Sequence, residues 1–488
     1  MTFVADVGVV RLTCQRAGEF PGPLSFRVVS VSSTPARTLA IAQIGTIDEG
    51  GGAATVARGL MRGYAARGHR VWHLVGRKCS DDPDVRLIPD DDRWPLRLSG
   101  YTALQNGLRR LTGRFPGRGL GLISRLLRLA THPGAAVSQL RGIEDFDFPA
   151  TERLLDRLEP APDLLHGHNL HGGFFDLRAL ASLSVRVPTV LTLHDMWLLT
   201  GHCAHSLDCD RWRTGCGSCP ALHLDPAIRR DATAGNWKRK QAVYAKSRLH
   251  VATPSQWLRD KVEASMLAPA IKSLRVIPNG VDTSVFRPAD RPAVRQMLDL
   301  PDGTFVVLLT TGTKGSMWKD DVMLRETMRR VSERQPAQPI LFVTVGRESA
   351  VTHLGAAKTR SIPSQRDSVT MARYYQAADL YLHAAVADTF PLAVMEAMAC
   401  GTPVVATAVG GVPEQIRSTG DATGVLVPRG DSAAMAAAVD ALLRDARARA
   451  RLGANAAADV LARFTLDRQV DAYLDWYAEI LERRSIWS

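Results

Sequence analysis

Short apolar runs alternate with longer amphipathic stretches along most of this chain. The first clear unit begins at Thr38, where the apolar run TLAIAQIG leads into the glycine-rich TIDEGGGAA and then into a polar stretch. In that stretch the apolar residues between Ala57 and Tyr64 fall at helical spacing, and Gly68 follows as a stop signal. The apolar run HRVWHLVG comes next. This strand–helix–strand order predicts parallel strands.

The alternation occurs twice, on either side of the segment IPNGVDTSVFRP at residues 277–288. In the first half further strands are predicted at Asp163–His168, Thr189–His194, His250–Pro254 and Leu274–Pro278. In the second half they are predicted at Phe305–Thr311, Pro339–Val345, Asp379–Ala385, Thr402–Thr407 and Gly424–Val427. We therefore expect an α/β protein with two doubly wound domains and a boundary where Pro and Asn-Gly cluster.

The expected organisation has four parts. They are an extension at 1–37, a first domain at 38–276, a second domain at 277–465 and a terminal helix at 466–488. The terminal helix carries an aromatic stripe, Tyr473, Trp476 and Tyr477. This stripe either crosses back onto the first domain or belongs to the core of the second.

Charge narrows the choice of partner. The chain of 488 residues has a formal charge of +12, which indicates an anionic partner such as a nucleotide, a nucleic acid or an acidic membrane. No apolar run approaches the roughly 20 residues of a membrane span. The N-terminus lacks the order of a signal peptide. We therefore expect a cytoplasmic protein.

One segment is strongly basic. Between Arg93 and Ile143 there is no acid, while arginines and leucines interleave, among them Arg109, Arg125 and Arg128. This basic insertion, 93–143, suits a helix on an anionic membrane surface, and so predicts peripheral binding at the inner face of the cell membrane. The alternative is a solvated basic face.

The segment from Asp379 to Ile416 carries most of the chemistry. A strand leads into a loop with Asp388, and a helix then opens at Pro391, holds Glu396 and is closed by Gly401. The helix N-terminus presents free N–H groups at the carboxyl edge of a parallel sheet, where anions bind. Two carboxylates beside an anion site suit hydroxyl groups of a neighbouring polyol. A sugar nucleotide carries both parts.

Three other candidates lie at predicted strand ends. The loop Asp48–Ala54 holds Gly51 and Gly52, which allow close backbone approach to a phosphate or sugar. His194 ends a strong strand, and the following Asp195 would orient it or bind a hydroxyl; a structural histidine is the alternative. In the second half, Lys314 and Lys319 follow a strand and would neutralise a diphosphate, whereas either lysine alone would be read as solvated.

The segment Asp379–Ile416 resembles the E-x7-E signature of the retaining glycosyltransferases of family 4, which have the GT-B fold: two Rossmann-like domains facing a central cleft. Here Asp388 replaces the first Glu. The resemblance implies that Glu396 contacts ribose hydroxyls and that Asp388 contacts donor hexose hydroxyls. It also implies donor contacts from these residues: Gly51, Gly52, His194, Lys314, Lys319, Phe390, Pro391 and Leu392.

Four cysteines cluster in a loop at 201–220. Cys203, Cys209, Cys216 and Cys219 have the number of thiols needed for a structural zinc site, and free or paired thiols are the alternative. The same segment, with HD-x-W-x-x-TG-x-C and GC-x-x-CP, resembles bacterial exopolysaccharide transferases of the colanic-acid type.

The expected activity follows from the resemblance. A hexosyl group would move with retention from a nucleotide diphosphate sugar to a saccharide, such as a lipid-linked saccharide in polysaccharide biosynthesis. The resemblance implies front-face substitution, which needs no catalytic metal or other cofactor. A sugar-nucleotide epimerase of the same fold is the alternative enzyme. A nucleic-acid-binding protein is the alternative of another class, but no recognised module supports it and no nucleic acid is expected as partner.

Overall fold

The computed structural model describes residues 37–88, 133–311, 317–335 and 339–487. Thr38–Ser488 form one compact unit. The predicted extension at 1–37, except its last residue, and most of the predicted basic insertion lie outside the described residues, as does Lys314. None of the described helices is both long enough and apolar enough to cross a membrane.

The first sheet has seven parallel strands in the order β3-β2-β1-β4-β5-β6-β7. Its strands are β1 Ala40–Ile47, β2 Arg70–Arg77, β3 Val85–Leu87, β4 Leu164–Gly167, β5 Thr189–Thr192, β6 Leu249–Thr253 and β7 Ile271–Val276. Its helices are α1 Gly52–Ala66, α4 Pro133–Leu140, α5 Leu180–Arg186, α6 Thr233–Tyr244 and α7 Gln256–Glu263. The strand order reverses between β1 and β4, and ligands of such sheets bind at that point.

The second sheet follows the order β10-β11-β9-β8-β12-β13-β14. Its strands are β8 Phe305–Thr310, β9 Ile340–Val345, β10 Ala350–Leu354, β11 Ala357–Ile362, β12 Leu380–His383, β13 Val404–Thr407 and β14 Gly424–Val427. Its helices are α8 Arg291–Met297, α9 Asp321–Arg334, α10 Ser368–Ala377, α11 Leu392–Ala399, α12 Val412–Gln415, α13 Ser432–Arg444 and α14 Ala446–Arg463. Only β10, which pairs with β11, is antiparallel.

The sequence pattern missed three short or exposed strands, β3, β10 and β11. Strand β3 has only three residues, and β10 is exposed along most of its length. Neither has the buried apolar run that marks the inner strands, because each lies at a sheet edge. The predicted class, an α/β protein with two Rossmann-like sheets, is confirmed.

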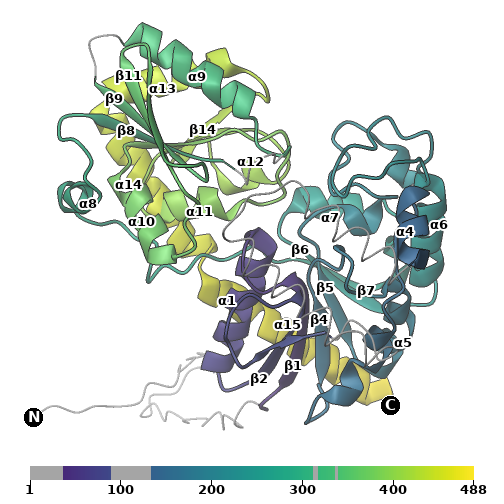
Figure 1. Ribbon diagram of the computed structural model, residues 1–488. Coiled ribbons are helices and arrows are strands. Elements are labelled where there is room, and N and C mark those ends of the chain that lie inside the picture. The colour runs from purple at the N-terminus through teal and green to yellow at the C-terminus, as the bar shows by residue number, and fades with distance from the viewer. Residues whose placement is uncertain (1–36, 89–132, 312–316, 336–338, 488) are drawn as a thin grey trace, which may run out of the picture. The chain divides into compact units, whose positions relative to one another are not determined.

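The last helix, α15 (Leu466–Trp487), lies against α1 of the first sheet (Figure 1). Tyr473, Trp476 and Tyr477 are fully buried in the same apolar cluster as Tyr64 of α1. Tyr477 and Tyr64 share a hydrogen bond of 3.0 Å between their hydroxyls, and the Tyr473 hydroxyl lies 2.6 Å from Thr192. The aromatic stripe therefore belongs to the core beside the first sheet.

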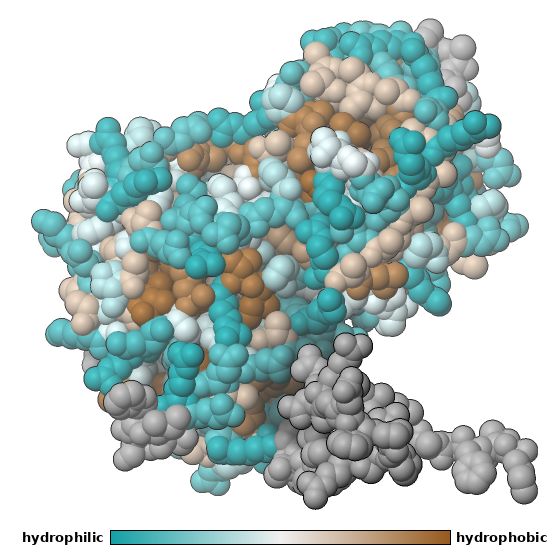
Figure 2. Space-filling model, turned by 180° about the vertical axis from the view of Figure 1, so that it is seen from behind, coloured by the Kyte–Doolittle hydropathy of each residue, from teal (hydrophilic) through white to brown (hydrophobic). Residues whose placement is uncertain are grey.

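Polar side chains cover much of the face seen in Figure 2, and smaller apolar areas lie among them. The strands beneath are almost entirely buried: every residue of β9 and of β13 is buried. This contrast is the pattern of a sheet covered by helices on both faces. The residues free to bind a ligand are therefore those at the strand ends.

Candidate functional site

Asp388 and Lys319 form the centre of a charged cluster at the end of β12. Nζ of Lys319 lies 3.0 Å from Oδ2 of Asp388 and 3.3 Å from Nε2 of His383. Although burial favours the neutral acid, the Lys319 ammonium and His383 hold the pKa of Asp388 well below its usual range. Burial and the charge of Lys319 lower the pKa of His383 to about 4. The site thus contains an ionised Asp388 and a neutral His383 at pH 7.

Helix α11 begins four residues after Asp388 and brings Glu396 to the same region. The hydroxyl of Tyr375 donates to Oε2 of Glu396 across 3.1 Å. Burial raises the pKa of Glu396 to about 7, because the ionised form loses water contacts and gains no cation. Among the described residues, no side-chain capping hydrogen bond is formed at the α11 N-terminus, Pro391. Its first N–H groups can therefore bind an anion.

The loop before α11 is held from three sides. The Asn279 amide donates to the carbonyl of Phe390, and the Gln415 amide donates to the carbonyl of Pro391. A Cβ on Gly410 would lie 1.8 Å from the carbonyl oxygen of Asp388, so only glycine fits against this loop. The position of the Asp388 carboxylate is therefore set by packing that a larger residue would displace.

At the edge of the first sheet, His194 contacts another histidine instead of Asp195. Nε2 of His194 lies 3.0 Å from Nδ1 of His168, and burial lowers the pKa of His194 to about 4. Both rings are therefore neutral at pH 7, in agreement with the lowered pKa of His168, whose main cause is also burial. Nε2 of His168 has no hydrogen-bond partner within the described structure.

Asp195 pairs with His171, a residue that the sequence analysis did not select. Nε2 of His171 lies 2.9 Å from Oδ2 of Asp195, and the backbone N–H of Trp197 donates to the other carboxylate oxygen. Burial favours the neutral imidazole, but the Asp195 carboxylate outweighs it and raises the pKa of His171. The expectation that Asp195 orients His194 is therefore wrong, since its carboxylate is engaged elsewhere.

The glycine-rich loop is open on the side where a ligand would approach. Gly50 and Gly51 have φ values of 97° and 86°, and a Cβ on Gly51 or Gly52 would meet no atom within 4 Å. Behind them Asp48 accepts hydrogen bonds from the backbone N–H groups of Cys79 and Ser80. The loop thus has a fixed base and a free backbone surface next to α1, at the end of β1.

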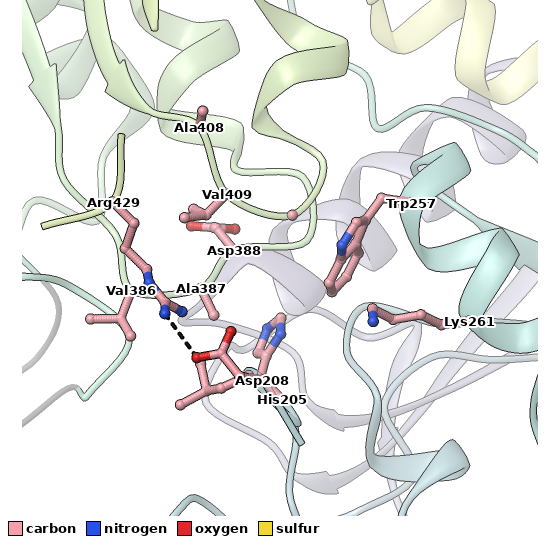
Figure 3. A pocket seen from close by; sticks show the side chains of 12 residues that line it. His205, Asp208, Trp257, Lys261, Val386, Ala387, Asp388, Ala408, Val409 and Arg429 are labelled. Carbon is pink, nitrogen blue, oxygen red and sulfur yellow. Dashed lines mark hydrogen bonds and ion pairs between the residues drawn. The ribbon is translucent and has the colours of Figure 1, made fainter. Parts of the chain in front are cut away.

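A polar pocket lies between these two edges (Figure 3). From the first half it is lined by His205, Leu207, Asp208, Trp257 and Lys261, and from the second by Val386, Ala387, Asp388, Ala408, Val409, Gly410 and Arg429. Two contacts cross beside it. Arg429 pairs with Asp208 at 2.9 Å, and both oxygens of Glu414 accept from the first N–H groups of α7.

The cysteine-rich loop does not form the metal site that was considered. Among the described residues no group of three or more His, Cys, Asp or Glu side chains is arranged to hold a metal ion. Sγ of Cys219 lies 3.5 Å from Nε2 of His202, but the four thiols do not converge. Burial raises the pKa of Cys203 to about 12 and that of Cys216 to about 11, which favours the protonated thiols. The structural-zinc interpretation is therefore not supported.

Two models of known protein families match this chain, one in the part that holds the first sheet and one in the part that holds the second. Residues 50–285 match the family model described as Glycosyltransferase Family 4, and residues 327–459 match the model described as Glycosyl transferases group 1. The chain is a member of the family 4/group 1 glycosyltransferases. The matched ranges include the loop with Gly51 and Gly52, His194, Asp388 and Glu396.

Two curated relatives are named as D-inositol 3-phosphate glycosyltransferases. This chain is 34% identical to the one from Stackebrandtia nassauensis over 224 residues, and the aligned region is 43% of this chain and 50% of the relative. This chain is 29% identical to D-inositol 3-phosphate glycosyltransferase 1 of Catenulispora acidiphila over 333 residues, and the aligned region is 66% of this chain and 73% of the relative. The chain spans about half the length of most such relatives. These names do not support the narrower resemblance to colanic-acid-type transferases.

Solved structures agree with the fold of the family. A sucrose-phosphate synthase from Thermosynechococcus elongatus has a TM-score of 0.60 at 18% identity and covers 92% of this chain and 100% of its own. HepE from Anabaena, solved in complex with UDP and glucose, has a TM-score of 0.57 at 17% identity. The match covers 90% of this chain and 99% of HepE. At these identities the likeness establishes the GT-B fold.

Sequence reasoning therefore found one part of the candidate site and missed another. Asp388 and Lys319 are in contact, and Glu396 lies on the adjoining helix. The residues missed were His383, His171, His205, Trp257, Lys261 and Arg429. A histidine inside the apolar run DLYLHAA was a usable signal for His383, because a buried polar side chain there needs partners. Trp257 and Lys261, which line the pocket from α7, gave no such signal.

Proposed function

We propose that this protein transfers a hexosyl group from a nucleoside diphosphate sugar to a hydroxyl of a polyol or saccharide acceptor. One observation carries the proposal: Asp388 and Glu396 flank the uncapped N-terminus of α11 at the carboxyl edge of the second sheet. N–H groups and the helix dipole suit the diphosphate, and carboxylates suit sugar hydroxyls. The family membership of both halves supports the same activity.

In this proposal the second half binds the donor. Glu396 accepts from ribose hydroxyls, Asp388 from hexose hydroxyls, and the backbone from Phe390 to Leu392 faces phosphate or sugar. Lys319 has three N–H donors, of which two are directed at Asp388 and His383. The third is available to the diphosphate, where negative charge grows as the bond to the sugar breaks. Lys314 would add a second cation.

The first half would hold the acceptor beside the donor sugar. The open backbone of Gly51 and Gly52 and the neutral ring of His194 lie at the carboxyl edge of the first sheet. We infer a front-face reaction with retention, in which the leaving phosphate accepts the proton of the acceptor hydroxyl. No catalytic metal is required if Lys319 and the α11 N-terminus stabilise the diphosphate.

The acceptor has two candidates. The relatives named above act on D-inositol 3-phosphate according to their names, which favours a phosphorylated polyol. The basic insertion 93–143 favours a lipid-linked saccharide used on the cytoplasmic face of a membrane. Both present a hydroxyl nucleophile near an anionic group.

Donor binding followed by product analysis tests the activity. UDP-, GDP- and ADP-sugars are screened by thermal shift, since a ligand that binds only the folded state raises the melting temperature. The best donor is then incubated with inositol phosphate or with a lipid-linked saccharide, and the anomeric configuration of the product is read by NMR. A retained anomer is expected. An inverted product would refute the front-face reaction, and no stabilisation by any nucleotide sugar would refute the function.

A further inference from the structure

The pocket of Figure 3 carries one positive charge that forms no ion pair with a described residue. Of the two carboxylates in its lining, Asp208 is paired with Arg429 at 2.9 Å and Asp388 with Lys319 at 3.0 Å. Lys261 is the remaining charged side chain of that lining. Across the described residues, no carboxylate lies within ion-pair distance of its ammonium, and Nζ makes no hydrogen bond. Asp210 attracts the ammonium only at longer range and is itself paired with Arg213 at 3.4 Å.

Two aromatic rings hold Lys261 in this position. It lies one helical turn after Trp257 on α7, with Nζ 4.9 Å from the centre of the Trp257 ring and 5.4 Å from that of Trp212. Cation–π attraction at this range orients the ammonium but leaves its N–H groups without acceptors. Burial lowers the pKa of Lys261, as expected for a partly desolvated cation.

The aromatic side chains around Lys261 suit a sugar or polyol ring. The ring of His205 lies 6.1 Å from Trp257 and 5.0 Å from Trp318, measured between centres. Burial lowers the pKa of His205, so these side chains are aromatic and uncharged at pH 7. Figure 3 shows the ammonium end of Lys261 directed toward the side where His205 and Trp257 lie. Aromatic faces pack against the C–H face of a sugar and leave its polar substituents to Lys261.

We propose that Lys261 binds the anionic substituent, a carboxylate or a phosphate, of the sugar or polyol that occupies this pocket. The inference rests on the proposed function, because it places a substrate group beside Asp388. A ligand anion would supply the direct ion-pair partner that the described residues do not, and a charge-assisted hydrogen bond in a partly desolvated site is among the stronger polar contacts. Lys261 is then a specificity-determining residue that separates acidic from neutral substrates.

Binding of matched neutral and acidic probes tests the proposal. The full chain, saturated with UDP, is titrated with glucose and glucuronate and with inositol and inositol phosphate, and affinities are measured by saturation-transfer NMR. Each acidic probe should bind about tenfold more tightly than its neutral partner. Lys261→Met should remove this preference and Lys261→Arg should keep it. Lys272→Met, which removes an exposed lysine on β7, serves as the matched control and should behave as the wild type.

The result separates the possible sources of the anion. If the acidic group belongs to the donor, the free protein should prefer UDP-glucuronate over UDP-glucose, and Lys261→Met should abolish that preference. If it belongs to the acceptor, the two donors should bind alike and the acidic preference should appear only among the acceptor probes.

Two outcomes would overturn the proposal: equal wild-type affinity for acidic and neutral probes in both arms, or an unchanged acidic preference in a folded Lys261→Met variant. Binding of UDP-sugars, together with no acidic preference among either the donors or the acceptor probes, would refute this inference alone. Failure of every nucleotide sugar to bind would refute the proposed function, whatever the acidic probes do.

Discussion

Lys319 donates a hydrogen bond to Asp388 across 3.0 Å, so its ammonium is already engaged before a donor sugar arrives. The pair joins two segments that lie 69 residues apart. It keeps Asp388 ionised and ready to accept hydroxyl hydrogen bonds. If Lys319 binds the diphosphate and Asp388 binds the hexose, as proposed, the pair joins these two contacts into one unit, and loss of either residue is expected to disturb both.

Replacing Lys319 by Met should therefore reduce transfer strongly. The change removes a diphosphate donor and leaves Asp388 without its cation, which raises the pKa of that carboxyl toward or above its usual range. We expect kcat/KM to fall by about 100-fold, the scale seen when one electrostatic donor to a transition state is removed. Lys358→Met, at an exposed site on β11, is the control. Steady-state kinetics with an unchanged kcat/KM in folded Lys319→Met would remove Lys319 from the reaction.

Glu396 should make donor binding depend on pH near neutrality. Its pKa of about 7 means that the carboxylate able to accept from ribose forms as pH rises through that value. Donor affinity should therefore increase between pH 6 and 8 in the wild type, and Glu396→Gln should bind weakly with a flatter profile. Calorimetric titration across this range is the measurement. A wild-type profile in Glu396→Gln would exclude contact with the donor.

The same group makes a prediction for stability. The folded pKa of Glu396, about 7, lies above the ordinary glutamate value of 4.5, so the folded state binds its proton more tightly. Its contribution is neutral below about pH 4.5, becomes destabilising as pH rises to 7 and is fully destabilising above that. Glu396→Gln should thus raise the melting temperature more at pH 8 than at pH 5. Equal shifts at both pH values would contradict burial as the cause of the raised pKa.

The pair His171–Asp195 should also contribute stability that decreases as pH rises, here because a raised histidine pKa favours the charged form in the folded state. Asp195 raises the pKa of His171 above its ordinary value, so the contribution is present below about pH 6.5 and is lost as pH rises through the folded pKa. Asp195→Asn should lower the pKa of His171, followed by NMR of its ring protons, and should cost more stability at pH 5.5 than at pH 8. A loss that does not vary with pH would indicate a packing effect alone.

Chelation should leave turnover intact. The diphosphate is expected to be stabilised by Lys319 and by the N–H groups of α11, which need no metal. Treatment with EDTA followed by immediate assay should therefore give the untreated rate. Prompt loss of activity that magnesium or manganese restores would show that a cation takes part. The unfolding temperature, recorded in parallel, separates such a loss from denaturation.

The basic insertion, most of which lies outside the described residues, should bind anionic vesicles. Each arginine near an anionic surface contributes about 1 kcal/mol, and the attraction falls with salt over a Debye length of about 8–10 Å. Neutralising Arg109, Arg110, Arg125 and Arg128 should release the protein from these vesicles and leave donor binding unchanged. Sedimentation with vesicles measures the fraction of protein that is bound to them.

Matched control changes fall on exposed arginines of the second half: Arg444, Arg447, Arg451 and Arg468. These changes remove as much charge and should leave vesicle binding largely intact. Equal sedimentation with neutral and anionic vesicles would leave the insertion as an ordinary basic surface.

By itself the sequence determined the two-sheet architecture and one half of the candidate site. Buried strands and amphipathic helices leave periodic signals, and a proline start with a glycine stop located the helix that holds Glu396. The strand, loop and helix around Asp388 lie close along the chain, so local pattern was enough to join Asp388 and Glu396. Exposed edge strands such as β10 carry no such period and were missed.

Only the tertiary structure decided which side chains meet across the chain. Asp195 follows His194 directly but pairs with His171, 24 residues away, because the ends of neighbouring parallel strands meet at one edge. Four cysteines close in sequence do not form a metal site among the described residues, because neighbours in sequence need not bring their thiols into coordination geometry. Lys261 becomes a candidate for binding an anion only because the two carboxylates of its pocket are paired with other cations. Contacts of this kind depend on packing between distant segments, which leaves no regular spacing to read.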